Sequence, residues 1–130
     1  LKLILSQTFK NLTNLENLNL KNNKIETIEQ GAFLDLYNLK FLNLDNNRIN
    51  VLNKKMLYGL KIMFDLKLRS NKIEKIEVET FMGLNSLEYL DISNNRIKIV
   101  NKNTFYGLNS LRYINLIKNR KNNLVDILKI

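Results

Sequence analysis

The sequence of 130 residues contains neither histidine nor cysteine. Histidine is the usual general base near neutral pH, the cysteine thiolate is a common nucleophile, and zinc prefers both as ligands. Their absence argues against most classes of enzyme, and the sequence implies no metal and no cofactor. Because there is no disulfide to form, the composition alone permits either the cytosol or the cell exterior.

Long apolar runs are also missing. No stretch approaches the roughly 20 apolar residues that a transmembrane helix needs, so we expect no membrane contact within this chain. The apolar N-terminus, Leu1 to Leu5, is too short for the core of a signal peptide and fits a repeat described below. The length predicts a single domain spanning residues 1–130.

The formal net charge is +9, which would attract acidic partners and polyanions. Asparagine, lysine and isoleucine are abundant together, however, as biased codon usage would also produce. A polyanion-binding surface requires basic residues to cluster as well as to be numerous. The net charge by itself therefore favours codon bias over a functional basic surface.

The chain repeats itself every 24 residues. Four columns define the first half of the unit: Leu15, Leu39, Met63, Leu87 and Leu111; Leu18, Leu42, Leu66, Leu90 and Ile114; Leu20, Leu44, Leu68, Ile92 and Leu116; and Asn23, Asn47, Asn71, Asn95 and Asn119. Further apolar columns fill the second half: Ile25, Ile49, Ile73 and Ile97; Ile28, Leu52, Ile76 and Val100; Phe33, Leu57, Phe81 and Phe105; and Leu36, Leu60, Leu84 and Leu108.

This register divides the domain into units. Residues 15–38, 39–62, 63–86 and 87–110 are full repeats, and 111–130 is a partial repeat with a possible C-terminal cap. Residues 1–14 fit the tail of a preceding repeat, with Phe9 and Leu12 in its last columns. We therefore expect the sequence to be part of a longer array.

The beginning of each unit alternates apolar and polar residues, as in Glu16 to Leu20, which predicts a short strand. Units that each bury one apolar face against their neighbours stack, and their strands pair in parallel about 4.8 Å apart. The rest of each unit must return along the other side as loops or short helical turns. The sequence thus predicts an α/β solenoid whose strands line a concave face.

The asparagine column needs a separate explanation, because an unpartnered buried amide costs about 1 to 3 kcal/mol. Its donors and acceptor can bond to the backbone of the turn that leaves each strand, which would link adjacent units in a ladder. Asn23, Asn47, Asn71, Asn95 and Asn119 are therefore predicted to be structural.

With these motifs the chain resembles the leucine-rich repeat family, whose pattern LxxLxLxxN appears at Leu15 to Asn23, Leu39 to Asn47 and Leu87 to Asn95. Met63 to Asn71 and Leu111 to Asn119 carry it with substitutions. The resemblance covers nearly the whole chain and implies a horseshoe-shaped solenoid used in protein recognition. The 24-residue unit with phenylalanine is similar to the type found in extracellular and receptor-like proteins.

The chain departs from the family pattern in three places. Leu57 replaces a phenylalanine and Met63 a leucine, which predicts looser packing in the third unit. The family's cysteine-rich caps are absent. The segment from Arg120 to Ile130 has Asn123 and Val125 where a C-terminal cap would have cysteines.

Side chains that leave the strands on the outer side of the sheet are the candidate binding residues. Aromatic residues beside arginine form typical interface hot spots. The candidate ligand-binding residues are Phe41, Phe64, Tyr89, Tyr113 and Arg69 as anchors, with Asp65, Lys67 and Asp91 as a charged surround. Equally, the aromatic residues could be cross-strand pairs that only stabilise the sheet.

A basic residue follows the asparagine in every unit: Lys24, Arg48, Lys72, Arg96 and Arg120. This column could bind a polyanion, although long basic side chains also cover apolar surface while their charged ends stay solvated. The second interpretation is the simpler one.

Asn11, Leu12 and Thr13 form the sequence's single glycosylation sequon. Such triplets also arise by chance in an asparagine-rich chain. The sequon is compatible with secretion.

Together these features predict a protein-binding module rather than an enzyme, with a protein as its ligand and an extracellular or cell-surface location. The alternatives are an intracellular, cytoplasmic adaptor of the same fold and a polyanion-binding module.

Overall fold

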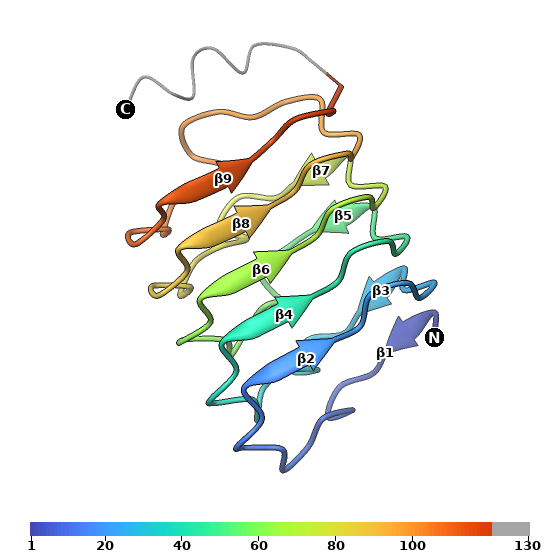
Figure 1. The fold of residues 1–130 in the computed structure, drawn as a ribbon, viewed down its shortest axis with the longest axis vertical. Coiled ribbons are helices and arrows are strands. Elements are labelled where there is room, and N and C mark those ends of the chain that lie inside the picture. Colours follow the sequence, from blue (N-terminus) through green and yellow to red (C-terminus); the bar gives the residue numbers. More distant parts are fainter. Residues whose placement is uncertain (121–130) are drawn as a thin grey trace.

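The computed structural model describes residues 1–120, which form a stack of similar coils around one interior (Figure 1). Five short strands, one in each coil, lie side by side along the stack. They are β2 (Asn17–Asn19), β4 (Phe41–Asn43), β6 (Asp65–Lys67), β8 (Tyr89–Asp91) and β9 (Tyr113–Asn115). These strands form one sheet in the order β2-β4-β6-β8-β9, and every pairing is parallel.

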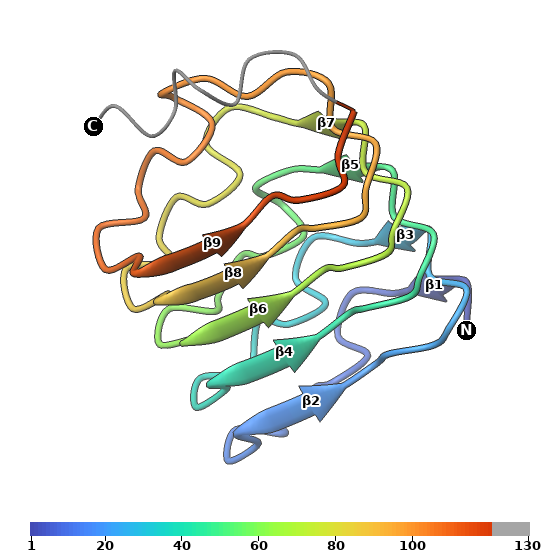
Figure 2. The ribbon, with the colours of Figure 1, turned by 45° about the horizontal axis from the view of Figure 1, so that its top comes forward.

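The register of this sheet is the 24-residue step of the sequence. Leu42 pairs with Leu18 on one side and with Leu66 on the other, and Leu66 pairs with Leu90 (Figure 2). The middle residue of β4, β6 and β8 is buried, whereas the residue before it is exposed or half-buried. The predicted solenoid of parallel strands is therefore confirmed.

The return side of each coil consists of turns and short extended segments. Two small parallel sheets occur there, β1 (Leu3–Ile4) with β3 (Thr27–Ile28) and β5 (Val51–Leu52) with β7 (Lys75–Ile76). Within residues 1–120 there is no helix, so the return segments are loops rather than short helical turns. Left-handed backbone contributes to this, because a residue such as Gly59, with φ of +100°, cannot continue a right-handed helix.

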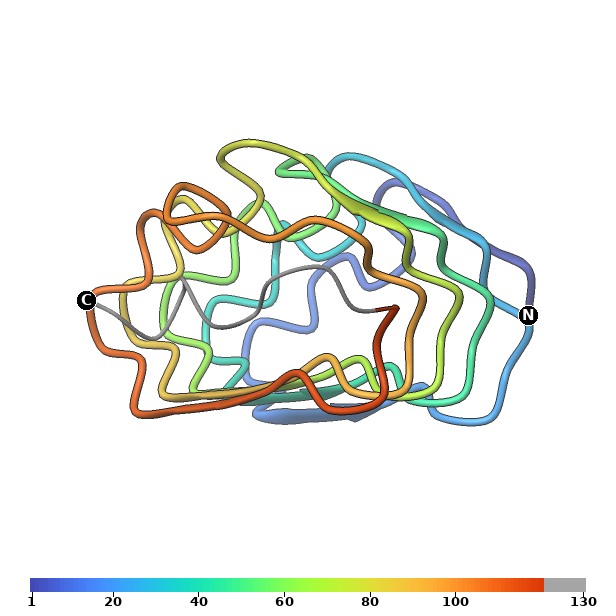
Figure 3. The same ribbon diagram turned by 90° about the horizontal axis from the view of Figure 1, so that it is seen from above.

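The coils enclose one interior (Figure 3), and a single cluster of buried apolar side chains fills most of it. Phe9 stacks on Phe33 with ring centroids 5.8 Å apart, and Phe81 stacks on Phe105 at 5.9 Å. The side chains of the inner coils are fully buried, while those of β2 and β9 are only partly covered. The central coils therefore contribute most of the hydrophobic stabilisation.

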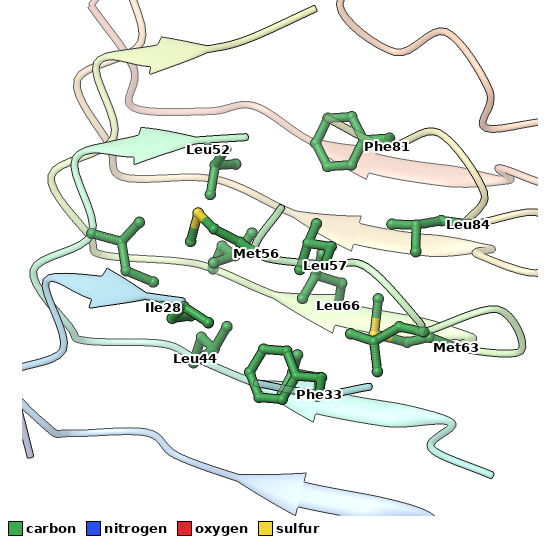
Figure 4. Close-up of a cluster of buried hydrophobic side chains, with 14 of the residues drawn as sticks. Ile28, Phe33, Leu44, Leu52, Met56, Leu57, Met63, Leu66, Phe81 and Leu84 are labelled. Carbon is green, nitrogen blue, oxygen red and sulfur yellow. The ribbon is translucent and has the colours of Figure 1, made fainter. Parts of the chain in front are cut away.

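Leu57 and Met63, where looser packing was expected, are both buried (Figure 4). Other coils place a small residue before the phenylalanine, as in the pair Ala32 and Phe33. Here Met56 precedes Leu57, and both side chains belong to the buried cluster. Packing depends on the combined volume of both residues, so the looser packing of this unit stays a prediction.

The asparagine column bonds to two coils at once. Asn71 Nδ2 donates to Leu68 O of its own coil at 3.1 Å and to Leu44 O of the preceding coil at 2.9 Å, while Oδ1 accepts from Ile49 N at 3.1 Å. The same pattern of donors and acceptor recurs at Asn47, Asn95 and Asn119. Asn23 donates to Leu20 O and Lys21 O of its own coil. The buried amides thus tie each coil to its neighbour.

A second polar column, which sequence reasoning missed, precedes the asparagines. Its members have left-handed backbone, with φ between 52° and 61°, and are Asn22, Asn46, Ser70, Asn94 and Lys118. Asn46 Nδ2 donates to Asn22 Oδ1, and Asn94 Nδ2 donates to Ser70 Oγ, both at 2.8 Å. Asparagine tolerates this conformation better than most residues do, which explains the repeated Asn-Asn pair in the sequence.

The division into repeats stays a prediction, as does a single domain over residues 1–130. The expected C-terminal cap lies mostly beyond residue 120, and Asn123 and Val125 fall outside the described residues.

Replacing Asn71 by alanine tests the ladder. We expect Asn71→Ala to lower the free energy of unfolding by about 2 kcal/mol or more, because buried backbone groups of two coils lose their partner. Asn17→Ala is the matched control, since Asn17 is exposed on the sheet surface. It should change the free energy of unfolding by less than about 0.5 kcal/mol. Urea unfolding measures both variants; equal effects would contradict the structural role.

Candidate functional site

The outer face of the five-stranded sheet carries a continuous row of aromatic rings. Phe41 and Phe64 meet edge to face at a centroid distance of 5.9 Å, Phe64 and Tyr89 are 5.1 Å apart, and Tyr89 and Tyr113 are 6.3 Å apart. We call these four residues the aromatic row. The row crosses β4, β6, β8 and β9, because the 24-residue register places Phe41, Tyr89 and Tyr113 in one column and Phe64 just before β6.

The row is accessible to a partner. Phe41 and Tyr89 are each 40% exposed and Tyr113 is 52% exposed. These side chains are largely apolar, so the row presents apolar area to solvent. The rings also contact one another, which holds them in place before a partner arrives. The row therefore combines exposed apolar area with little conformational entropy left to lose on binding.

Arg69, which sequence reasoning grouped with the aromatic residues, lies apart from them. It is four residues beyond Asp65, so it stands roughly 13 Å further along the strand direction than the column of Tyr89. Its side chain is exposed. Arg69 thus belongs to another part of the same face.

Asp65 lies within the aromatic row and Lys67 lies beside it. The two side chains form a long ion pair, with Lys67 Nζ 3.9 Å from Asp65 Oδ2. Burial raises the pKa of Asp65, the Lys67 ammonium opposes that shift, and the carboxylates of Asp45 and Asp91 add to it. The charged residues expected around the aromatic anchors are therefore adjacent to them.

Asp91 and three asparagines of the same column bond to their own backbone. Asp91 Oδ1 accepts from Ser93 N at 2.9 Å, and the side chains of Asn19, Asn43 and Asn115 likewise accept from the amide two residues on. These bonds turn the chain out of each strand. Because these side-chain oxygens already accept backbone hydrogen bonds, the column offers a ligand fewer free acceptors than the sequence pattern indicated.

Asp45 is a buried acid that sequence reasoning did not single out. It is 8% exposed, and its Oδ1 accepts from Arg69 N at 2.8 Å. Burial raises the pKa of Asp45; the bond from Arg69 lowers it, and the nearby Asp91 carboxylate raises it further. The sequence showed only that Asp45 follows a strand. Its burial could not be predicted, because a neighbouring coil covers the side chain.

A shallow hollow of about 380 Å³ lies on the sheet face beside Phe41. Its lining is mainly amide side chains with one ion pair: Asn17, Asn19, Asn43, Asp65 and Lys67, together with Leu18 and Leu42. The aromatic row thus borders a polar depression that a partner could fill.

The basic column lies along one flank of the stack, where a groove of about 570 Å³ is lined by Arg48, Lys72, Lys75 and Arg96. Acidic residues alternate with the basic ones. Arg48 Nη1 lies 3.7 Å from Glu26, and both Arg96 and Lys98 approach Glu74 at 3.8 Å. The flank is therefore a mixed surface in which part of the positive charge is compensated.

A second exposed apolar column lies on the return side and was not expected. Its members are Leu34, Tyr58, Met82 and Tyr106, which are 42% to 63% exposed. No aromatic pair joins the two tyrosines among the described residues. Tyr58 and Tyr106 are therefore useful controls for the aromatic row.

Asn11, the predicted glycosylation site, is exposed in the turn that leads to β2. Its backbone φ is 65°, and its amide N donates to Asp35 Oδ2 at 2.9 Å. The turn thus presents the sequon side chain outward from a fixed backbone.

Two further features concern function. Among residues 1–120 no three or more histidine, cysteine, aspartate or glutamate residues are grouped so as to hold a metal ion. In the same part of the chain, no helix has the length and apolarity needed to cross a membrane.

The stacked 24-residue coils, the parallel sheet and the asparagine bonds define a repeat solenoid. The family model described as leucine rich repeat matches residues 1–49, 13–73 and 63–120. The chain belongs to the leucine-rich repeat family.

Two solved structures resemble this fold. The TLR13–ssRNA13 complex is similar with a TM-score of 0.79 and 33% identity, over 83% of this chain and 15% of that one. The complex of Toll with Spatzle from Drosophila has a TM-score of 0.76 and 21% identity, over 91% of this chain and 17% of that one. The chain thus spans about a sixth of either relative. No curated protein matches it.

Replacing Asp45 by asparagine should raise the melting temperature at pH 7. Its raised pKa means that the folded state binds a proton more tightly than the unfolded state does. The stability that this tighter proton binding contributes is fully present below the unfolded pKa of 3.8. It is lost as the pH rises through the pKa of the folded state. The substituted amide would be neutral at every pH and could still accept from Arg69 N, so the gain should shrink at pH 3.

Thermal unfolding of the wild type and Asp45→Asn at both pH values measures this difference. Glu26→Gln removes one negative charge from the exposed flank and serves as the control. A gain for Asp45→Asn that is as large at pH 3 as at pH 7 would exclude the charge as its cause.

Proposed function

We propose that this chain is a protein-binding module of a receptor-like protein, and that the sheet is a concave recognition face with the aromatic row at its centre. The observation that supports this is the contiguity of the four rings, which pack against one another across paired strands and of which Phe41, Tyr89 and Tyr113 are exposed. Clustered aromatic residues on a rigid surface are the usual centre of a protein interface. A non-enzymatic role agrees with the family, whose members serve recognition.

An extracellular or cell-surface location is part of the proposal. It is supported by the similarity to the Toll and TLR13 structures and by the exposed sequon at Asn11. Glycosylation of Asn11 would follow from secretion. An intracellular adaptor is the alternative, since the fold alone does not fix the compartment.

Tyr89→Ala tests the recognition face. Ligands selected from a displayed library of protein domains should bind this variant at least about tenfold more weakly than the wild type, because the central ring contributes the most buried area. The melting temperature should change little, since Tyr89 contacts other surface rings rather than the core.

Tyr106→Ala is the matched control, because Tyr106 is an exposed tyrosine on the return side. Its binding should equal that of the wild type. Arg69→Ala shows in addition whether a ligand extends along the strands. Ligands that respond to Tyr106→Ala but not to Tyr89→Ala would place recognition on the other side, and a joint loss of binding and stability in Tyr89→Ala would indicate a folding role.

A polyanion-binding function is the second candidate, and the basic groove with Arg48, Lys72 and Arg96 favours it. One of the two solved structures of similar fold, the TLR13–ssRNA13 complex, is by its name a complex with single-stranded RNA. Against this candidate, Glu26 and Glu74 pair with basic residues of the groove.

Binding of heparin or of single-stranded RNA as a function of salt tests this candidate. Displacement of counterions by several basic side chains makes affinity fall steeply, by about a thousandfold between 50 and 200 mM salt for six or more contacts. Because the flank is partly neutralised, we expect a shallow dependence. A steep one that Lys72→Gln and Arg96→Gln reduce would favour the polyanion function instead.

A further inference from the structure

Asp65 lies between Phe41 and Tyr89 of the aromatic row, and we call this position the notch. In the sheet its register neighbours are Phe41 on β4 and Tyr89 on β8, and all three side chains leave the sheet on the same face. The ring of Phe64 lies 5.9 Å from that of Phe41 and 5.1 Å from that of Tyr89. Aromatic residues therefore flank Asp65 on both neighbouring strands, and the residue before it, Phe64, places its ring next to both of theirs.

The carboxylate of Asp65 is incompletely satisfied. Its nearest cation, Lys67 Nζ, lies 3.9 Å away, whereas a charge-assisted hydrogen bond is about 2.7 to 2.9 Å long. No hydrogen bond to this carboxylate occurs among the described residues. The Lys67 side chain itself is half exposed to solvent. The acceptor positions of Asp65 are thus available to a ligand.

Carboxylates outnumber cations around the notch, where Asp45 and Asp91 join Asp65 and the one ammonium is that of Lys67. The carboxylates of Asp45 and Asp91 act on Asp65 in the same direction as burial does, which raises its pKa, and Lys67 acts against them. The notch therefore differs from the chain as a whole, whose formal net charge is +9. A partner selected by overall charge would be acidic, but a group that enters the notch meets carboxylate and the negative faces of aromatic rings.

We propose that this notch binds a basic side chain, arginine or lysine, presented by the protein partner. The proposal rests on the proposed function, because it names the chemical group that anchors a partner on the same face. A guanidinium group can stack on a ring of the row while donating two hydrogen bonds to Asp65.

Other occupants fit less well. An apolar side chain would remove water from Asp65 without giving it a donor, and leaving a buried carboxylate unpaired is costly. An acidic side chain would meet like charge. A cation instead replaces the long contact with Lys67 by a short one and covers the rings, so charge complementarity selects the basic group.

Three short capped peptides test the preference directly: Ac-Leu-Arg-Leu-NH₂, the same peptide with norleucine, and the same peptide with glutamate. Ring and amide resonances of Phe64 and Tyr89 followed by NMR report the binding. We expect the arginine peptide to bind about fivefold or more tightly than the norleucine peptide, and the glutamate peptide to bind most weakly. Equal affinity for all three peptides would overturn the proposal.

Two substitutions should change the arginine preference in opposite directions. Asp65→Asn should reduce it to less than about twofold, because the anionic acceptor is gone. Lys67→Met keeps the alkyl stem and removes the internal cation that competes for Asp65, so it should strengthen arginine binding by about two- to fivefold.

Lys75→Met is the matched control, since Lys75 is an exposed lysine on the flank paired with Glu77. It removes the same charge and should leave the arginine preference unchanged. Equal strengthening by Lys67→Met and Lys75→Met would indicate only the change in net charge. Melting temperatures within a few degrees of the wild type confirm that the variants fold; if Asp65→Asn does not, Lys67→Met still decides the question.

The experiment separates the two proposals. Library ligands that depend on Tyr89 but show no basic residue at the contact, together with no effect of Asp65→Asn, would overturn the notch and leave the recognition face intact. Ligands that do not depend on Tyr89, alongside a persistent arginine preference in the peptides, would overturn the recognition face and keep the notch as a cation site.

Discussion

The fold depends on one constraint: a buried asparagine amide needs partners from two coils at the same time. Asn71 satisfies it with the carbonyls of Leu44 and Leu68, which are 24 residues apart. A coil that gained or lost a residue would bring one carbonyl out of reach, and the unpaired amide would cost about 1 to 3 kcal/mol. The amides therefore fix the coil length, and a fixed coil length aligns every column, outward as well as inward. The aromatic row exists because Phe41, Tyr89 and Tyr113 share one of these columns.

Periodicity predicted the parts of the fold that every coil repeats. Leu42 and Leu66 were placed in the interior because their columns are apolar, and the register confirms it. What periodicity could not predict depends on two residues compensating each other or on a neighbouring coil. Met56 and Leu57 stand where other coils have a small residue and phenylalanine, and both are buried, which neither column shows alone. The loops of the return side likewise follow from backbone φ values, which residue types indicate only where glycine or asparagine recurs.

For the candidate site, the sequence predicted which residues face outward but not which of them meet. Phe64 lies outside the strand, and only the structure shows its ring between those of Phe41 and Tyr89. Arg69 was grouped with the rings by its type, yet an extended chain rises about 3.3 Å per residue and carries it away from them. Asp65 appeared as one charge among several. Its surroundings come from both neighbouring strands and from Phe64, so no local sequence pattern reveals them.

Net charge and contact chemistry act over different distances on this surface. The outward columns of the sheet carry three acidic side chains, Asp45, Asp65 and Asp91, and three basic ones, Lys21, Lys67 and Arg69, so the face itself is neutral within a chain of formal charge +9. The field of the whole chain acts over a Debye length of about 8 Å at physiological salt, and it governs how a partner approaches. Once water is excluded from the face, single charges dominate, because their interactions strengthen as the dielectric constant falls. A partner of this chain therefore need not be uniformly acidic: acidic outer regions would favour its approach, while a basic group at the contact would match Asp65.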